Sequence, residues 1–148
     1  MLADIQKTAY QDAVEQVWTA EEFTSLMSGP GVCAMVIICD EQPCGFLMWR
    51  QVAEEAEILS LCILPEYRRQ GHGHRILQKF SGHLALSSVR QIFLEVRENN
   101  EAATTLYNNS AFEIVGRRKG YYGRKQDALI MKFTMPEDGL KKIGIGLD

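Results

Sequence analysis

The spacing of apolar residues changes character about thirty residues into this 148-residue chain. Residues 1–28 are expected to be helical, with one apolar side formed by Ala13, Val14, Val17 and Trp18. Thr19 followed by Glu22 is typical of a capping box, so a second short helix is expected to begin there. The pair Gly29-Pro30 predicts its end.

The next segment has the pattern of β-strands. Apolar runs at residues 33–39, 44–50 and 57–63 are separated by a turn at residues 40–43 and by an acidic pair at residues 54–55. Strands that are joined by such short turns pair as antiparallel hairpins. The three runs therefore predict an antiparallel meander.

A turn, a helix and a further strand follow this meander. Pro65 ends the third strand, and apolar residues recur at helical spacing from Gly71 to about Ser87. Residues 91–97, QIFLEVR, predict the next strand. Because a helix connects it to the strand before Pro65, the two strands are expected to be parallel.

The last third of the chain predicts one helix and two closing strands. Asn99 or Asn100 is expected to cap the helix, and residues 112–118 and 127–134 predict the strands. The predicted fold class is α/β (α+β), with a mixed, mostly antiparallel sheet flanked by helices. Residues 1–135 are expected to form one domain, and residues 136–148 a loose polar tail.

Charge and hydropathy limit the classes of partner. The net charge of −3 argues against broad nucleic-acid binding. No apolar run reaches the roughly 20 residues that span a bilayer, and residues 1–18 lack the apolar segment of a signal peptide. We therefore expect a cytoplasmic protein that binds neither nucleic acid nor membrane.

The four cysteines lack the spacing of a metal site. Three of them lie within or beside apolar runs, which predicts buried free thiols in a reducing compartment rather than disulfides. They are Cys33, Cys39, Cys44 and Cys62.

Basic residues gather at the turn between the third strand and the following helix. Arg68, Arg69, Arg75 and Lys79 stand against one acid, Glu66. Glycines in this turn leave backbone N–H groups exposed at the positive end of a helix, where phosphate oxygens can be held. The turn predicts a binding site for the pyrophosphate of a cofactor. The alternative is a basic helix face that is only solvated.

The sequence also carries a family resemblance. Arg68-Arg69-Gln70-Gly71-His72-Gly73, after a strand that ends Ile63-Leu64-Pro65, resembles the acetyl-CoA motif of the GNAT family of N-acetyltransferases. Residues 94–107, which begin Leu-Glu-Val-Arg and end Leu-Tyr, resemble the second half of that family's core. They are most similar to the bacterial ribosomal-protein-alanine N-acetyltransferases, which acetylate the N-terminal alanine of a small-subunit ribosomal protein.

The resemblance implies a fold and a set of site residues. It implies that the two central parallel strands splay apart, that the pantetheine arm of acetyl-CoA lies in the gap, and that a backbone N–H near Ile63 stabilises the oxyanion. The implied cofactor-binding residues are Leu61, Cys62, Ile63, Arg68, Arg69, Gln70, Gly71, His72, Gly73, His74 and Asn100. The implied substrate-binding residues are Trp18, Tyr121 and Tyr122.

Two residues are implied to be catalytic. Glu95 is expected to act as a general base through a water, and a strand carboxylate in an ion pair, such as one with Arg97, is the alternative. Tyr107 is expected to protonate the departing thiolate, and a core aromatic side chain is the alternative. An N-cap role explains Asn100 almost as well as cofactor contact.

Other candidate chemistry is weaker. Cys62 as a covalent nucleophile is less economical than strand packing, and His72 with His74 lacks a third metal ligand nearby, so no metal site is predicted. Surface or phosphate-side histidines are expected instead.

The chain departs from the family pattern in three places. Only seventeen residues precede Trp18, so the first strand of the family is expected to be absent or the chain to start late. Val17 replaces a proline. Ala111 replaces the glycine that ends the helix before Phe112, and Asn108 or Asn109 is expected to take the left-handed conformation instead.

The predicted function is acetyl-CoA-dependent acetylation of a protein N-terminal α-amine, with a ribosomal acceptor by resemblance. A small-molecule amine or a lysine side chain is the alternative acceptor. A domain that binds acetyl-CoA without catalysis is the third possibility.

Overall fold

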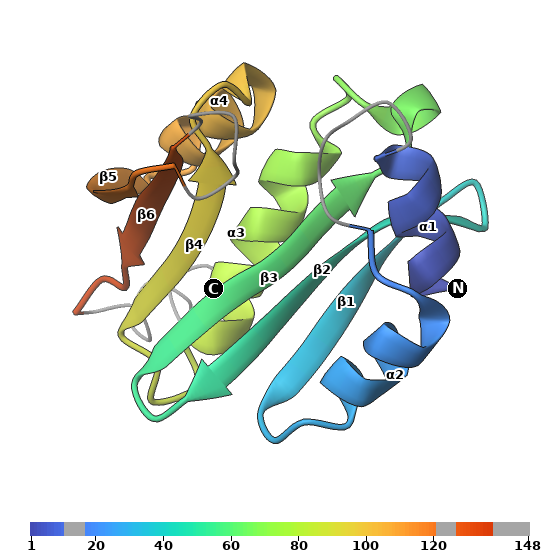
Figure 1. Cartoon of the computed structure of the whole chain (residues 1–148). Coiled ribbons are helices and arrows are strands. Elements are labelled where there is room, and N and C mark those ends of the chain that lie inside the picture. The colour runs from blue at the N-terminus through green and yellow to red at the C-terminus, as the bar shows by residue number, and fades with distance from the viewer. Residues whose placement is uncertain (11–16, 121–126, 138–148) are drawn as a thin grey trace, which may run out of the picture.

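A computed structural model describes residues 1–10, 17–120 and 127–137 of the chain. Its helices and strands lie in three layers, with a sheet between two helical layers (Figure 1). In chain order they are α1 (Leu2–Ala9), α2 (Ala20–Met27), β1 (Val32–Cys39), β2 (Gln42–Val52), β3 (Glu55–Ile63), the 3-10 turn η1 (Pro65–Tyr67), α3 (His72–Leu84), β4 (Gln91–Arg97), α4 (Glu101–Asn109), β5 (Glu113–Arg118) and β6 (Ala128–Thr134).

The described residues form a six-stranded sheet in the order β1-β2-β3-β4-β6-β5. Among these strands only β3 and β4 pair in parallel, because α3 carries the chain back between them; the other neighbours are antiparallel. The predicted fold class, including the parallel pair, is confirmed.

Local signals explain where the helices begin. The hydroxyl of Thr19 accepts the backbone N–H of Glu22, whose carboxylate reaches back to the Thr19 N–H, so the capping box is confirmed. Asn100 caps α4, because its side-chain oxygen accepts the N–H of Ala103 at 3.1 Å. Gly71 precedes α3 with φ of 84°, a left-handed conformation that glycine adopts easily.

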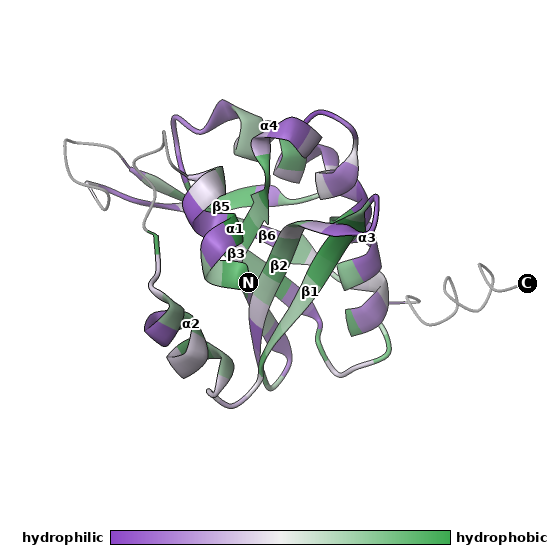
Figure 2. Cartoon of the chain, turned by 90° about the vertical axis from the view of Figure 1, so that its right-hand side faces the viewer, coloured by the Kyte–Doolittle hydropathy of each residue, from purple (hydrophilic) through white to green (hydrophobic). Residues whose placement is uncertain are grey.

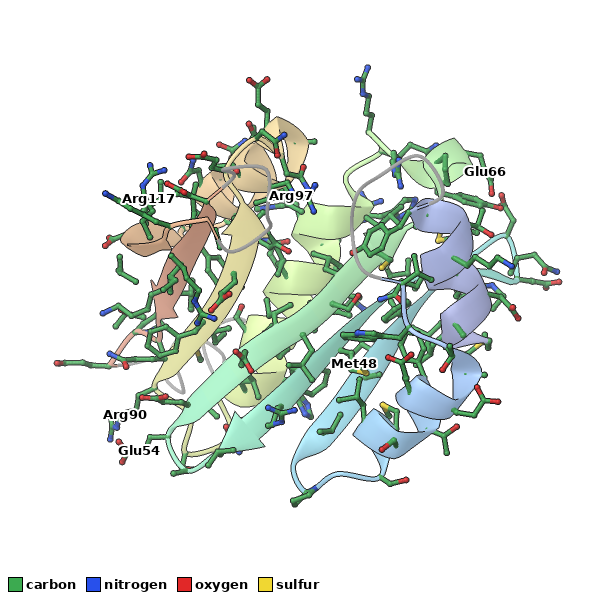
Figure 3. The ribbon with its side chains drawn as sticks, in the orientation of Figure 1. Met48, Glu54, Glu66, Arg90, Arg97 and Arg117 are labelled. Atoms are coloured by element: carbon green, nitrogen blue, oxygen red, sulfur yellow. A yellow bond between two sulfur atoms is a disulfide. The ribbon has the colours of Figure 1, made fainter. Side chains whose placement is uncertain are left out.

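Each face of the sheet covers its own core. The larger core lies under α3 and α4 and contains Leu77, Phe80, Leu94, Tyr107 and Phe112 among its members. The smaller core lies under α1 and α2. Figure 3 shows Met48 on the face that α1 and α2 cover. At the sheet edge, apolar residues of β1 face the viewer in Figure 2, and Ile38 is exposed there.

An irregularity in β3 changes which residues face each core. The pairing with β2 shifts between Met48 and Trp49, so that Leu59 is an extra residue opposite them. Before the shift, Ile58 belongs to the core under α3; after it, Cys62 belongs to the core under α1. The bulge therefore sets the direction of the side chains at the end of β3.

The parallel strands β3 and β4 pair at one end only. Their paired residues run from Glu55 with Gln91 to Glu57 with Phe93 and stop there. Arg90 and Glu54 lie at the paired end, where the N–H of Arg90 donates to the carbonyl of Glu54 at 2.7 Å. Arg97 lies at the opposite end (Figure 3). The predicted splay is confirmed, and it begins beside the bulge.

Several sequence predictions were wrong in detail. Val17 and Trp18 lie before α2 rather than on a helix, and α1 ends at Ala9. Helix α3 ends at Leu84, short of Ser87. Residues 13 and 14 and the tail from residue 138 lie outside the described residues.

Helix α4 ends differently from the prediction. Ala111 itself takes the left-handed conformation, with φ of 68°, rather than Asn108 or Asn109. The helix includes both asparagines and ends at Asn109, with Ser110 as its C-cap. The left-handed residue follows this cap and directly precedes Phe112. Alanine therefore occupies a backbone conformation that glycine adopts more easily.

The prediction of four free thiols was also wrong. Cys39 and Cys44 form a disulfide across the hairpin of β1 and β2, where antiparallel pairing places two residues five positions apart close together. Cys33 and Cys62 remain thiols, but Cys33 is exposed rather than buried. Buried Cys62 is consistent with strand packing.

Candidate active site

The turn between β3 and α3 presents backbone N–H groups at a positive helix end. The first helical bond of α3 runs from the N–H of Arg75 to the carbonyl of Gly71, so the N–H groups of His72, Gly73 and His74 lie ahead of the helical ladder. The first turn of α3 contains no acidic residue. This arrangement suits an anion with several oxygens.

Arginine side chains surround this turn. Arg75 folds back over it and donates to the carbonyl of Gln70 at 3.0 Å, while its guanidinium also meets His72 Nδ1 at 3.0 Å. Arg69 has φ of 60°, and Arg68 and Arg69 are both exposed. Two cations of the loop and one of α3 therefore stand at this turn, which favours a ligand of more than one negative charge.

Gly73 allows α3 to approach α4 closely. A Cβ at this position would lie 2.9 Å from Leu106 Cδ2, which is closer than carbon atoms pack. The N-terminus of α3 therefore packs against the C-terminal half of α4, whose own N-terminus carries Asn100.

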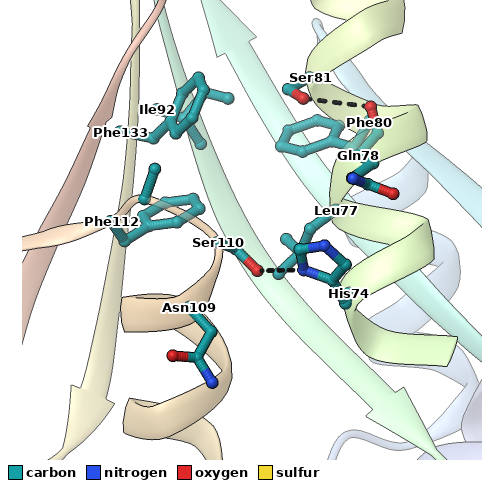
Figure 4. A pocket seen from close by; sticks show the side chains of 11 residues that line it. His74, Leu77, Gln78, Phe80, Ser81, Ile92, Asn109, Ser110, Phe112 and Phe133 are labelled. Atoms are coloured by element: carbon teal, nitrogen blue, oxygen red, sulfur yellow. Dashed lines mark hydrogen bonds between the residues drawn. The ribbon is translucent and has the colours of Figure 1, made fainter. Parts of the chain in front are cut away.

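His74 points away from the turn. Its Nδ1 lies 3.2 Å from the hydroxyl of Ser110, at the end of α4. Together with Phe80, Phe112 and Phe133 it lines a cavity of about 230 Å³ between the two helices (Figure 4). The phosphate-binding potential of His74 rests on its backbone N–H, because its side chain is engaged in this cavity.

The backbone of β3 directs polar groups into the splay. The N–H of Leu64 donates to the carbonyl of Cys44 at 2.8 Å, which makes these two a hydrogen-bonded pair with β2. Along antiparallel strands, hydrogen-bonded residue pairs alternate with non-bonded pairs. Leu61 and Ile63 belong to non-bonded pairs with β2, so their N–H and C=O groups face β4 instead. The groups of Cys62 face β2.

Side chains meet both of these carbonyls. Arg68 Nε donates to the carbonyl of Ile63 at 3.0 Å, and the Tyr10 hydroxyl donates to the carbonyl of Leu61 at 3.5 Å. The N–H groups of the same two residues also face the gap. They are donors in a position to stabilise negative charge.

Glu95 lies on β4 in an ion pair. Its Oε1 meets Arg118 Nη2 at 2.6 Å, and its side chain is 24% exposed. The ion-pair partner considered from sequence was Arg97, but Arg97 is buried and the pair is with Arg118 on β5. Leu94 belongs to the core under α3, so alternation points Glu95 to the face that carries α1.

Tyr107 lies on the opposite face. It is buried on α4, and its ring packs against Phe112 with centroids 5.5 Å apart. Glu95 and Tyr107 therefore approach the two strands from different sides of the sheet. A group that lies in the splay can be reached from both.

Trp18 lies near the end of α1, on the same face of the sheet as Glu95. Its backbone N–H donates to Gln6 Oε1 at 2.6 Å, and its ring meets Phe23 edge-on at 5.1 Å. Tyr121 and Tyr122, the other predicted substrate-binding residues, lie outside the described residues.

Sequence reasoning missed the residues of α1 and its C-cap that contact β3. Tyr10 reaches Leu61, and buried Gln6 donates to the hydroxyl of Ser60 at 3.3 Å. Burial, followed by the neighbouring Cys62, raises the pKa of Tyr10 well above its ordinary value. No motif marks these residues, because only the packing of α1 on β3 brings them to the site.

Metal binding and membrane insertion gain no support from the described part of the chain. Residues 1–10, 17–120 and 127–137 contain no group of three or more His, Cys, Asp or Glu side chains that could hold a metal ion. Within the same ranges, no helix has the length and apolar character of a membrane span.

A turn with exposed backbone N–H groups beside a splayed parallel pair indicates the class of the protein. The profile of the Acetyltransferase (GNAT) family matches residues 1–112, and the chain belongs to this family. The family uses acetyl-CoA. The unpaired donors of the turn and the gap beside β3 fit such a ligand.

Particular relatives are acetyltransferases of ribosomal proteins. The chain is 34% identical over 89 residues to the ribosomal protein bS18-alanine N-acetyltransferase of Escherichia coli, a match that spans 58% of this chain and 60% of the relative. It is 35% identical over 99 residues to the enzyme of the same name from Haemophilus influenzae, with 64% and 67% covered.

Solved structures agree with the fold. The crystal structure of the ribosomal-protein-S18-alanine N-acetyltransferase from Escherichia coli superposes with a TM-score of 0.81 at 26% identity, covering 90% of this chain and 84% of that one. The ribosomal-protein-alanine N-acetyltransferase from Brucella melitensis shares the fold at 19% identity, with a TM-score of 0.76 and coverage of 90% and 91%.

Proposed function

We propose that this chain is an acetyl-CoA-dependent N-acetyltransferase that acts on a protein N-terminal α-amine, the N-terminal alanine of a small-subunit ribosomal protein. The observation that carries the proposal is the gap between β3 and β4, which opens toward the positive end of α3. The relatives named after ribosomal protein bS18 support the acceptor. A ribosomal acceptor would place the enzyme in the cytoplasm.

The turn after β3 supplies affinity for the cofactor. The N–H groups of His72, Gly73 and His74 would hold pyrophosphate oxygens, and Arg68 and Arg69 would add positive charge. Gln70 and Gly71 shape this loop, and its glycine conformation keeps the backbone accessible. Asn100, at the start of α4, would contact the same ligand from the other side.

The end of β3 supplies the oxyanion donors. The N–H groups of Leu61 and Ile63 face the gap, so an added extended group can pair with this strand edge. One of these N–H groups would donate to the thioester oxygen as negative charge develops on it, while Cys62 between them stays paired with β2. Removal of one such donor costs about 10²–10³ in rate in other enzymes.

Glu95 and Tyr107 would move the protons. The neutral amine attacks the thioester carbon, a C–N bond forms and the C–S bond breaks. Glu95 accepts the proton of the amine nitrogen through a water, and Tyr107 gives its phenolic proton to the departing sulfur and is reprotonated from solvent. An α-amino group with a pKa of about 7.7–8.0 needs only such a modest base near neutral pH.

The acceptor would approach from the face of α1 and α2. Glu95 and Trp18 lie on this face, and Tyr121 and Tyr122 are proposed to complete the wall of the acceptor site. Tyr107 lies on the other face, so base and acid flank the reacting carbon. The placement of base and acid on opposite faces agrees with direct attack of the amine in a ternary complex, without a covalent enzyme intermediate.

The test is acetyl-CoA turnover on a peptide with the N-terminal sequence of the ribosomal acceptor. Acetylation of this peptide, and none of the same peptide with a blocked N-terminus, is the expected result. Peptides with other N-termini, internal lysines and small-molecule amines form the rest of the panel. Faster turnover on lysine or on a small amine would overturn the N-terminal acceptor. Tight acetyl-CoA binding by calorimetry without turnover of any amine would favour a binding domain.

A further inference from the structure

The hydroxyl of Tyr10 stands at the splay, on the face from which the acceptor would come. Tyr10 follows the last residue of α1, and its backbone N–H donates to the carbonyl of Gln6 at 2.9 Å, which fixes it as the C-cap. From there its hydroxyl reaches the Leu61 carbonyl at 3.5 Å, across 51 residues of sequence. That carbonyl is one of the backbone groups of β3 that face the gap.

A buried set of polar side chains orients this phenol. The Tyr10 hydroxyl interacts with Cys62 and Ser60, and the hydroxyl of Ser60 lies 3.3 Å from Cys62 Sγ. Gln6 Nε2 donates to Ser60 from the previous turn of α1. The interactions join the end of α1 to the same stretch of β3 that is proposed to hold the thioester.

Arg68 ties the backbone of α1 to the same strand. Its Nη2 donates to the carbonyl of Ala9 at 2.7 Å, while its Nε donates to the carbonyl of Ile63. A cation at a helix C-terminus is favourable, because the helix dipole is negative there. The residue before Tyr10 is therefore held against β3 by a charged hydrogen bond.

The protonation state of Tyr10 limits what it can do. Burial and the neighbouring Cys62 raise its pKa, so the phenol stays neutral at any pH at which the enzyme works. A neutral phenol donates one hydrogen bond and accepts others through its lone pairs. Its proton goes to the Leu61 carbonyl and the Ser60 hydroxyl meets its oxygen, so one lone pair remains for a donor from the acceptor side.

We propose that Tyr10 binds the acceptor amine, with its hydroxyl oxygen accepting one amine N–H and turning the nitrogen lone pair toward the thioester carbon. The assignment rests on the acetyl transfer proposed above. Tyr10 neither gains nor loses a proton in the step. Its role therefore differs from that of Glu95, which accepts the amine proton, and from that of Tyr107, which gives a proton to sulfur.

The variant Tyr10→Phe tests this role, since it keeps the ring in its packing and removes only the hydroxyl. One lost hydrogen bond of about 0.5–1.5 kcal/mol corresponds to a loss of roughly twofold to tenfold in kcat/KM for the acceptor peptide. The dissociation constant of acetyl-CoA and the shape of the pH–rate profile are expected to stay those of the wild type.

Ser88→Ala is the matched control. It also removes a hydroxyl that donates to a backbone carbonyl, that of Ala53 at 3.3 Å, but it lies at the paired end of β3 and β4. We expect no change in kcat/KM for this variant.

Three other results would overturn the assignment. If Tyr10→Phe acetylates the peptide as fast as the wild type, the hydroxyl does not bind the acceptor, and the proposed function stands. If acetyl-CoA binding weakens by the same factor as kcat/KM falls, Tyr10 acts on the cofactor side. If the wild type turns over no amine, the proposed function fails, and the role of Tyr10 fails with it.

Discussion

Glu95 of β4 and Arg118 of β5 form an ion pair across the intervening strand β6. The atoms Oε1 and Nη2 are 2.6 Å apart, although β4 and β5 do not pair with each other. On β5, Gly116 lies against Ile130 of β6, since a Cβ there would be 3.3 Å from Ile130 Cδ1. The proposed base is thus oriented by a residue from a different part of the chain.

Loss of the Glu95 carboxylate should slow acetyl transfer. Glu95→Gln keeps the shape of the side chain but cannot take a proton, so a fall in kcat of about 10²–10⁴ is expected. The pH–rate profile should lose its dependence on this base, while calorimetry shows unchanged acetyl-CoA affinity. Glu54→Gln, which lies at the paired end of the strands, is the control. An unchanged rate for Glu95→Gln would remove it from the mechanism.

Loss of the Arg118 guanidinium should affect catalysis more than stability. The side chains of the pair are 50% and 24% exposed, and ion pairs of this kind contribute at most about 1 kcal/mol to folding. Arg118→Gln is expected to lower kcat several-fold, because the carboxylate is less well oriented, with little change in the unfolding midpoint. If unfolding is strongly affected and kcat is not, the pair is structural only.

Two glycines of α3 should respond differently to alanine. Gly73→Ala places a Cβ 2.9 Å from Leu106 Cδ2, the end of a side chain that must shift, so a loss of about 1 kcal/mol in unfolding free energy and weaker acetyl-CoA binding are expected. Gly82→Ala meets nothing within 4 Å and improves helix propensity by about 1 kcal/mol. Urea unfolding of both variants measures the difference. Equal effects would show that the approach of α3 to α4 is not tight.

The end of α4 should gain from a glycine. Ala111 is held at φ of 68°, which costs an ordinary residue on the order of 1 kcal/mol, and Ala111→Gly is expected to recover part of it. Ala85 caps α3 at φ of −62°, so Ala85→Gly should instead lower stability. A destabilised Ala111→Gly variant in thermal unfolding would contradict this account.

The connection between β5 and β6 should make stability depend on acid pH. The Gly120 N–H and then the Arg117 guanidinium lower the pKa of Asp127 below its ordinary value. The unfolded state therefore binds the proton more readily, and the contribution of Asp127 is present above its unfolded pKa of about 3.8 and is lost as pH falls through the folded pKa. Unfolding midpoints of the wild type should fall more steeply below pH 4 than those of Asp127→Asn. Identical slopes would rule the contribution out.

Much of the fold is predictable because its signals are local. The alternation in residues 33–63, the capping box at Thr19 and the asparagine cap at Asn100 each act within a few residues. The glycine-bearing turn after Pro65 is equally local, so its residues alone are enough to predict an anion site. Helix ends are harder to predict, because α3 stops at Leu84 with no glycine or proline after it, and the hydroxyl of Ser87 donates to the Leu84 carbonyl at 2.6 Å.

The order of elements and the parallel pair follow from the amino-acid sequence, and the chemistry proposed for the turn, Glu95 and Tyr107 follows from its family resemblance. Which groups meet in the gap depends on tertiary packing. The bulge at Leu59 shifts the alternation of β3, α1 places Tyr10 on the Leu61 carbonyl, and Arg118 reaches Glu95 across a strand. The contacts of Tyr10 and of Arg118 join segments more than twenty residues apart. No local pattern encodes them, because they arise from the packing of helices and strands whose own formation is local.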